Sequence, residues 1–197
     1  MTGGTGMPPR FDPTQARLTG ADVLTRGLPE LPGVLTRDMT VPVAFWAADS
    51  CAAVLFLHYI RDPFDDTRRP FAVVGTYARD GAGWSAHSHW LGHGWNHDPV
   101  ANPDGLPDLD GQMIAGGGSG VFSDQPAPGH PAAVATGHVA PAVTGLALIQ
   151  DGREDRRELH CYFGAWVICT EQWAPYQVNA LDKTGAVIGS IDGPPRL

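Results

Sequence analysis

The sequence predicts an all-β fold, a single-domain β-sandwich or barrel of about nine or ten short strands with one short N-terminal helix. The first observation behind this is the number of chain breakers: 25 glycines and 18 prolines make up more than a fifth of the 197 residues. When glycine and proline are this frequent and follow no repeating period, they favour short secondary-structure elements joined by turns. The second is composition, since 43% hydrophobic and 17% charged residues are typical of a globular domain with a packed core.

The N-terminal region divides into a tail and a helix. Residues 1–13 are rich in glycine and proline and predict a disordered tail, whereas residues 14–197 are assigned to one β domain. Between Pro13 and Gly27 an apolar stripe predicts one short helix. Gly20 weakens this helix, because glycine has a low helix propensity.

Strand patterns begin near residue 40. Short alternating or continuous apolar runs predict strands at 41–46, 54–60, 71–79, from Trp84 onward, 133–139, 143–150, 159–168, 177–181 and 187–191. Residues 99–120 predict a long loop, with a short strand at 112–115 and a flexible turn at Ala115–Gly120. Any second helix is expected within this loop.

The charge distribution restricts the partners. The net charge is −8, and the stretch between Arg79 and Arg153 contains no Lys or Arg but seven Asp and six His. Nucleic acids and anionic membranes attract clustered positive charge, so neither is an expected partner. The same stretch is suited to attracting cations. The alternative is an acidic surface that serves solubility alone.

The cysteines and the chain start indicate a cytoplasmic protein. Cys51, Cys161 and Cys169 form an odd set without CxxC spacing, which is a poor disulfide framework and a poor zinc site. We expect buried free thiols, with Cys51 paired to neither of the others. The first residues resemble no secretory signal, and no apolar run approaches the ~18 residues of a membrane span.

The C-terminal third carries a recurrent pattern. Its elements are Gly137–Val143, the pair Asp151-Gly152, Phe163–Trp166 and Val178–Val187. This pattern resembles small β-sandwich modules in uncharacterised proteins of high-GC bacteria. The resemblance implies a fold and no activity, since function has to be argued from a site.

A cluster of histidines is the candidate for chemistry. His87, His89, His93 and His97 lie close together in sequence, followed by Asp98. On a regular strand His87 and His89 would point to the same side about 7 Å apart, a spacing suited to two imidazole ligands of one metal. His93 would be a third ligand if the chain bends. The alternative is a solvated strand face on which these histidines bind nothing.

The His-x-His pair also resembles the first metal motif of the cupins. In that motif a Glu follows four residues after the second His, a place that His93 takes here. The second cupin motif is matched loosely by Pro126–His130. The resemblance implies a barrel that holds a divalent transition metal.

Two functions follow from these observations. The first is a β-sandwich that binds a protein or small-molecule partner, because no complete catalytic set is visible. The second is a cupin-like metal-dependent enzyme that uses His87, His89 and His93. If the protein has a site, we expect it to include the segment from His87 to Asp98.

Overall fold

The computed structural model describes residues 11–62, 64, 67–122 and 129–193, with the backbone alone at 88–91. This part of the chain forms one helix and eleven strands, which confirms the all-β prediction. The elements are α1 (Pro13–Arg26), β1 (Val41–Ala47), β2 (Cys51–Arg61), β3 (Arg68–Asp80), β4 (Gly83–Gly94), β5 (Ile114–Val121), β6 (Ala133–Val139), β7 (Gly145–Gln150), β8 (Arg153–Glu158), β9 (Ala165–Thr170), β10 (Tyr176–Leu181) and β11 (Val187–Asp192).

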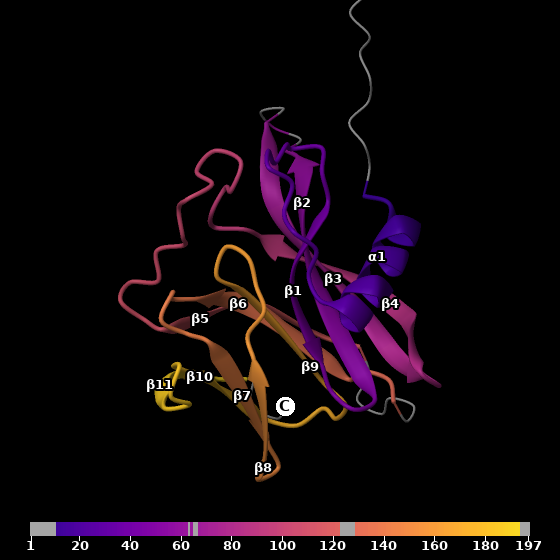
Figure 1. The fold of residues 1–197 in the computed structure, drawn as a ribbon, viewed down its shortest axis with the longest axis vertical. Coiled ribbons are helices and arrows are strands. Elements are labelled where there is room, and N and C mark those ends of the chain that lie inside the picture. Colours follow the sequence, from indigo (N-terminus) through magenta and orange to yellow (C-terminus); the bar gives the residue numbers. More distant parts are fainter. Residues whose placement is uncertain (1–10, 63, 65–66, 123–128, 194–197) are drawn as a thin grey trace, which may run out of the picture.

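The strands form three antiparallel sheets. Sheet A has the order β1-β2-β3-β4, sheet B the order β5-β6-β9 and sheet C the order β11-β10-β7-β8. In Figure 1, α1 lies against sheet A, while sheets B and C lie together on the other side of it. Among the described strands no sheet closes into a barrel, so the sandwich is the arrangement found.

Strand β2 is buried on both of its faces. Its odd-numbered side chains, from Cys51 to Tyr59, pack in the core shared with sheets B and C. Its even-numbered side chains Ala52, Val54 and Phe56 pack in a second cluster under α1. Two-sided burial explains why this segment is continuously apolar, as the sequence pattern predicted for a central strand.

Helix α1 begins and ends where the sequence predicts. The Asp12 carboxylate accepts hydrogen bonds from the backbone N–H groups of Thr14 (2.8 Å) and Gln15 (3.1 Å), and Pro13 takes the first helical position. Ala16 and Val23 face sheet A. Of the predicted tail at 1–13, residues 1–10 lie outside the described residues.

Gly20 has a packing role that its propensity alone does not suggest. A Cβ atom at this position would lie 1.7 Å from the hydroxyl oxygen and 2.3 Å from Cζ of Tyr77. Tyr77 is fully buried, and its hydroxyl donates to the Ala16 carbonyl at 3.1 Å. Glycine is therefore what allows α1 to approach β3 this closely.

Three strands differ from the sequence prediction. The strand predicted at 159–168 is β9, Ala165–Thr170, which begins only after the positive-φ residues Phe163 and Gly164. The turn predicted at Ala115–Gly120 is wrong, because this segment is part of β5 and pairs with β6. Strand β8 was not predicted, because its six residues, Arg-Glu-Asp-Arg-Arg-Glu, include none that is apolar. No helix among the described residues is long and apolar enough to cross a membrane.

We predict that Gly20→Ala lowers the free energy of unfolding by about 2 kcal/mol, as overpacking of a filled site does. The added methyl group has to displace the buried Tyr77 ring. Urea unfolding measures the effect. The matched control is Gly33→Ala, where nothing lies within 4 Å of the new Cβ. Equal stability of the Gly20 variant and wild type would contradict the packing role.

Candidate functional site

The backbone of β4 breaks the alternation on which the predicted metal pair depends. Tyr77 pairs with Ala86 and Thr76 pairs with Ser88, so His87 is an extra residue in a β-bulge. His89 pairs with Gly75, one step beyond the bulge, and its side chain lies outside the described part of the structure. A bulge interrupts the two-residue period, so a shared face for these two histidines no longer follows from their spacing.

The described partner of His87 is another histidine. The Nδ1 atoms of His87 and His130 lie 3.0 Å apart, and their ring centroids are separated by 4.5 Å. Desolvation and the nearby His130 lower the pKa of His87. His130 belongs to the segment Pro126–His130, which loosely matches the second cupin motif, and it lies beside His87. Pro126 lies outside the described residues.

His93 uses both of its ring nitrogens in contacts within the protein. Its Nδ1–H donates to the Gly94 carbonyl at 2.7 Å, and its Nε2 lies 2.9 Å from Thr136 Oγ1. The ring covers part of β5, since Cβ atoms at Gly117 and Gly118 would lie 2.6 and 2.3 Å from its carbon atoms. The glycine-rich composition of β5 therefore makes room for an imidazole.

His97 and His138 are buried, and within the described part of the chain their Nε2 atoms have no hydrogen-bond partners. The His138 ring meets Trp95 edge-on, with centroids 4.8 Å apart and planes at 88°. Burial, with smaller contributions from His93 and His97, lowers the pKa of His138 to about 4. His138 is therefore neutral near neutral pH.

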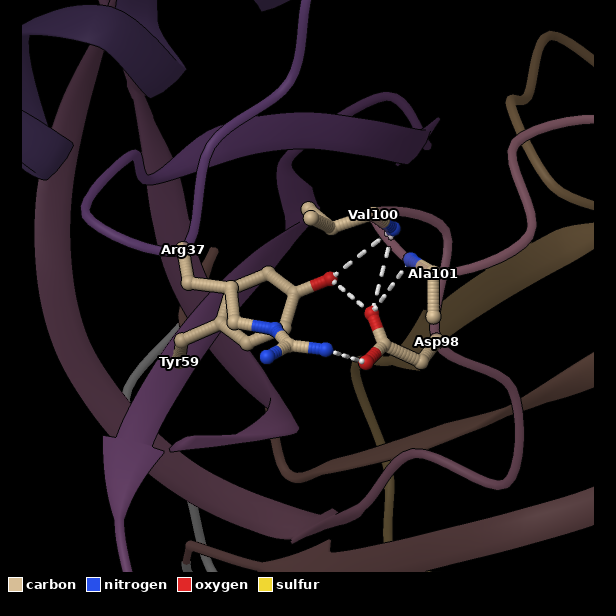
Figure 2. Close-up of polar contacts among 5 residues, drawn as sticks. All are labelled: Arg37, Tyr59, Asp98, Val100 and Ala101. Carbon is tan, nitrogen blue, oxygen red and sulfur yellow. Dashed lines mark hydrogen bonds and ion pairs between the residues drawn. The ribbon is translucent and has the colours of Figure 1, made fainter. Parts of the chain in front are cut away.

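Asp98 anchors the loop that follows β4 (Figure 2). Its Oδ1 accepts hydrogen bonds from Tyr59 Oη at 2.7 Å and from the backbone N–H groups of Val100 (3.1 Å) and Ala101 (3.3 Å). Its Oδ2 pairs with Arg37 Nη2 at 2.7 Å. Burial alone would raise the pKa of Asp98, but these bonds outweigh burial and lower it. The Asp98 carboxylate thus connects its own loop to Tyr59 and Arg37, and it has little capacity left to bind a metal ion.

The described histidines of this segment therefore contact different partners: His130 for His87, Thr136 for His93 and Phe163 for His97. Among the described residues, no group of three or more His, Cys, Asp and Glu side chains is arranged to hold a metal ion. The predicted metal site stays a prediction, because the His89 side chain is outside the described residues.

A second feature, which the sequence did not indicate, is an open groove of about 850 Å³. It lies between the turn that joins β1 to β2, the β7–β8 hairpin and the end of β9. Its apolar part is formed by Trp46, Leu148 and Cys169, all of them buried. The polar part of the lining includes five carboxylates, from Asp49, Asp151, Glu154, Asp155 and Glu171.

The groove carries more negative than positive charge. Two arginines, Arg153 and Arg157, oppose the five carboxylates, which leaves a formal charge of −3 on the lining. Arg157 Nε lies 2.7 Å from Asp155 Oδ1, so this guanidinium is already paired. Glu171 accepts a hydrogen bond from the Ser50 hydroxyl, which ties two sides of the groove together.

Strand β8 explains why the groove stays open. It forms with β7 a two-residue Asp151-Gly152 hairpin whose positive φ angles, 50° and 75°, suit a type I′ turn. The register places Asp155 opposite Leu148, so this charged side chain shares the core-facing side of sheet C. Charged groups resist burial, and inward-pointing charges protect an edge strand. Strands of the neighbouring sheets therefore do not close over β8.

One signal could have revealed this hairpin from the sequence. Asp-Gly directly after the apolar strand at 143–150 is a strong two-residue turn signal, and such a turn requires a returning strand. Arg153–Glu158 would then have been assigned as that strand despite its charges.

Compared with protein families, with curated proteins and with solved structures, the chain shows no significant match. The resemblances to small β-sandwich modules and to cupins therefore stay predictions.

We predict that His138 makes the fold sensitive to acid. Its folded pKa of about 4 is below the value of 6.5 for an unperturbed histidine, so between these values the unfolded chain alone takes up the proton. Stability that is complete above pH ~6.5 is then lost as the pH falls, by about 2 kcal/mol near pH 5. Urea unfolding at about pH 7 and pH 5 measures this loss. In His138→Gln the loss should shrink by that amount, and an equal loss in both proteins would refute the assignment.

Proposed function

We propose that this protein is a binding protein that holds a small organic cation in the groove between the β1–β2 turn and the β7–β8 hairpin. The observation that carries the proposal is the excess of carboxylates around an apolar floor. The ligand class that matches both parts is an aliphatic polyamine, whose ammonium groups are separated by methylene chains.

The carboxylates supply attraction and orientation. Clefts lined by one sign of charge concentrate ligands of the opposite sign and speed their association. Asp49 and Asp151 come from two different turns that border the groove, so a ligand with several ammonium groups can meet both. Their ion pairs with the ligand would be partly exposed, and each is worth roughly 0.2–1 kcal/mol.

The apolar part supplies a surface for the methylene chain. Trp46 and Leu148 form the floor of the groove, and because the protein buries them almost completely, the apolar surface they present to a methylene chain is small. Ligand sites commonly combine an apolar wall with a few charged groups that fix orientation. None of the described lining residues is a histidine, so this site is separate from the segment at His87–Asp98.

A charge-matched pair of triple variants tests the proposal with spermidine as the probe. The groove variant combines Asp49→Asn, Asp151→Asn and Glu154→Gln. Asparagine tolerates the positive φ at position 151, so the hairpin should be kept. Isothermal titration at low ionic strength should give an affinity about tenfold below that of wild type, the middle of the range expected when three weak ion pairs are lost.

The control variant removes three exposed carboxylates outside the groove, by Asp22→Asn, Glu30→Gln and Asp104→Asn. It has the same net charge as the groove variant and should bind like wild type. The proposal fails if wild type does not bind spermidine, or if the two variants lose affinity equally.

We also keep the cytoplasm as the proposed location. Its support is chemical, because Cys51, Cys161 and Cys169 all carry free thiols.

A further inference from the structure

Two thiols from different sheets meet beside the groove. Cys51 begins β2 in sheet A, and Cys169 lies near the end of β9 in sheet B. Their Sγ atoms are 3.2 Å apart. This is roughly 1 Å more than the ~2.05 Å of a disulfide bond, so a small side-chain movement would bring the sulfurs into bonding distance. The odd count of cysteines predicted buried free thiols, and all three are free, with Cys51 and Cys169 buried and Cys161 half-buried.

The cysteine pair lies at the wall of the groove. Cys169 lines the groove, and Cys51 directly follows Ser50, which also lines it. Ser50 in turn donates to Glu171, two residues after Cys169. A bond between the sulfurs would therefore join, covalently, the same two segments that this hydrogen bond already connects.

We propose that Cys51 and Cys169 are a modification site that forms a reversible disulfide on exposure to a peroxide. The Cys169 thiol, on the groove side, loses its proton and its sulfur attacks one peroxide oxygen. The O–O bond breaks, a sulfenic acid forms, and the departing hydroxide takes up the released proton as one water. The Cys51 sulfur then attacks the sulfenic sulfur, its proton leaves with the hydroxyl as a second water, and the S–S bond forms. Two thiols and one hydrogen peroxide thus give one disulfide and two waters, and a dithiol reductant reverses the step.

The environment sets the rate and the selectivity of this reaction. Both sulfurs are buried, and burial raises the pKa of the Cys169 thiol, so the thiolate is scarce near neutral pH. Oxidation is therefore slow and responds to sustained peroxide. Cys161 is the internal comparison, because burial raises its pKa to about 11 while no hydrogen-bonded thiol partner lies beside it.

Thiol counting and peptide mapping of the full chain test the proposal. The protein is incubated with hydrogen peroxide, alkylated, denatured and titrated. Wild type should fall from three thiols to one, with a peptide pair that links positions 51 and 169 and disappears with dithiothreitol. Cys161→Ala should fall from two thiols to none, whereas Cys51→Ala should form no internal link.

Thermal unfolding gives a second readout that requires no variant. The link spans 118 residues, and cross-linking a long loop stabilises a fold by restricting the unfolded chain. Oxidised wild type should unfold at a higher temperature than reduced wild type, and dithiothreitol should abolish the difference. The proposal is overturned if three thiols remain, if Cys161 forms the link, or if the linked protein unfolds at no higher temperature. Spermidine binding by the reduced protein is measured separately, so the two proposals can fail independently.

Discussion

Burial of sheet A on both faces is the constraint on which the rest of the arrangement depends. Side chains of β2 alternate between the cluster under α1 and the core shared with sheets B and C. A strand that is apolar on both sides has to be covered twice, because each exposed apolar face costs about 25 cal/mol per Å². Helix α1 covers one face of sheet A, and sheets B and C cover the other face. This brings β9 against β2 and places Cys169 beside Cys51.

The groove lies where this packing stops. Sheet C carries leucines on the core-facing side of β7, but the paired positions on β8 are charged. Asp155 and Arg157 pair with each other, but removing even a paired charge from water carries a desolvation cost, so the edge of sheet C stays in solvent. The same charges that keep the core from closing also line the opening. Solvation of β8 and the binding capacity proposed for the groove therefore have one physical origin.

The sequence predicts those parts of the fold in which local pattern and burial agree. Strand β2 was predicted because two-sided burial gives a continuous apolar run, and α1 was predicted from its apolar stripe and flanking residues. Strand β8 was missed because its residues carry no apolar signal and its pairing depends on the Asp151-Gly152 turn. The face taken by His87 could not be predicted, because a bulge is set by pairing with β3 and leaves no local signal. The groove was missed for a related reason, since it is formed by residues distant in sequence.

The groove, and not the histidine segment at 87–98, is the proposed place of ligand binding. Backbone amide shifts in a ¹⁵N-labelled sample during a spermidine titration test this most directly. We predict that the shifted signals cluster at 46–50, 148–157 and 169–172, together with the indole N–H of Trp46, which has no hydrogen-bond partner among the described residues. Shifts centred on 87–98, or small shifts spread over all acidic surfaces, would contradict it.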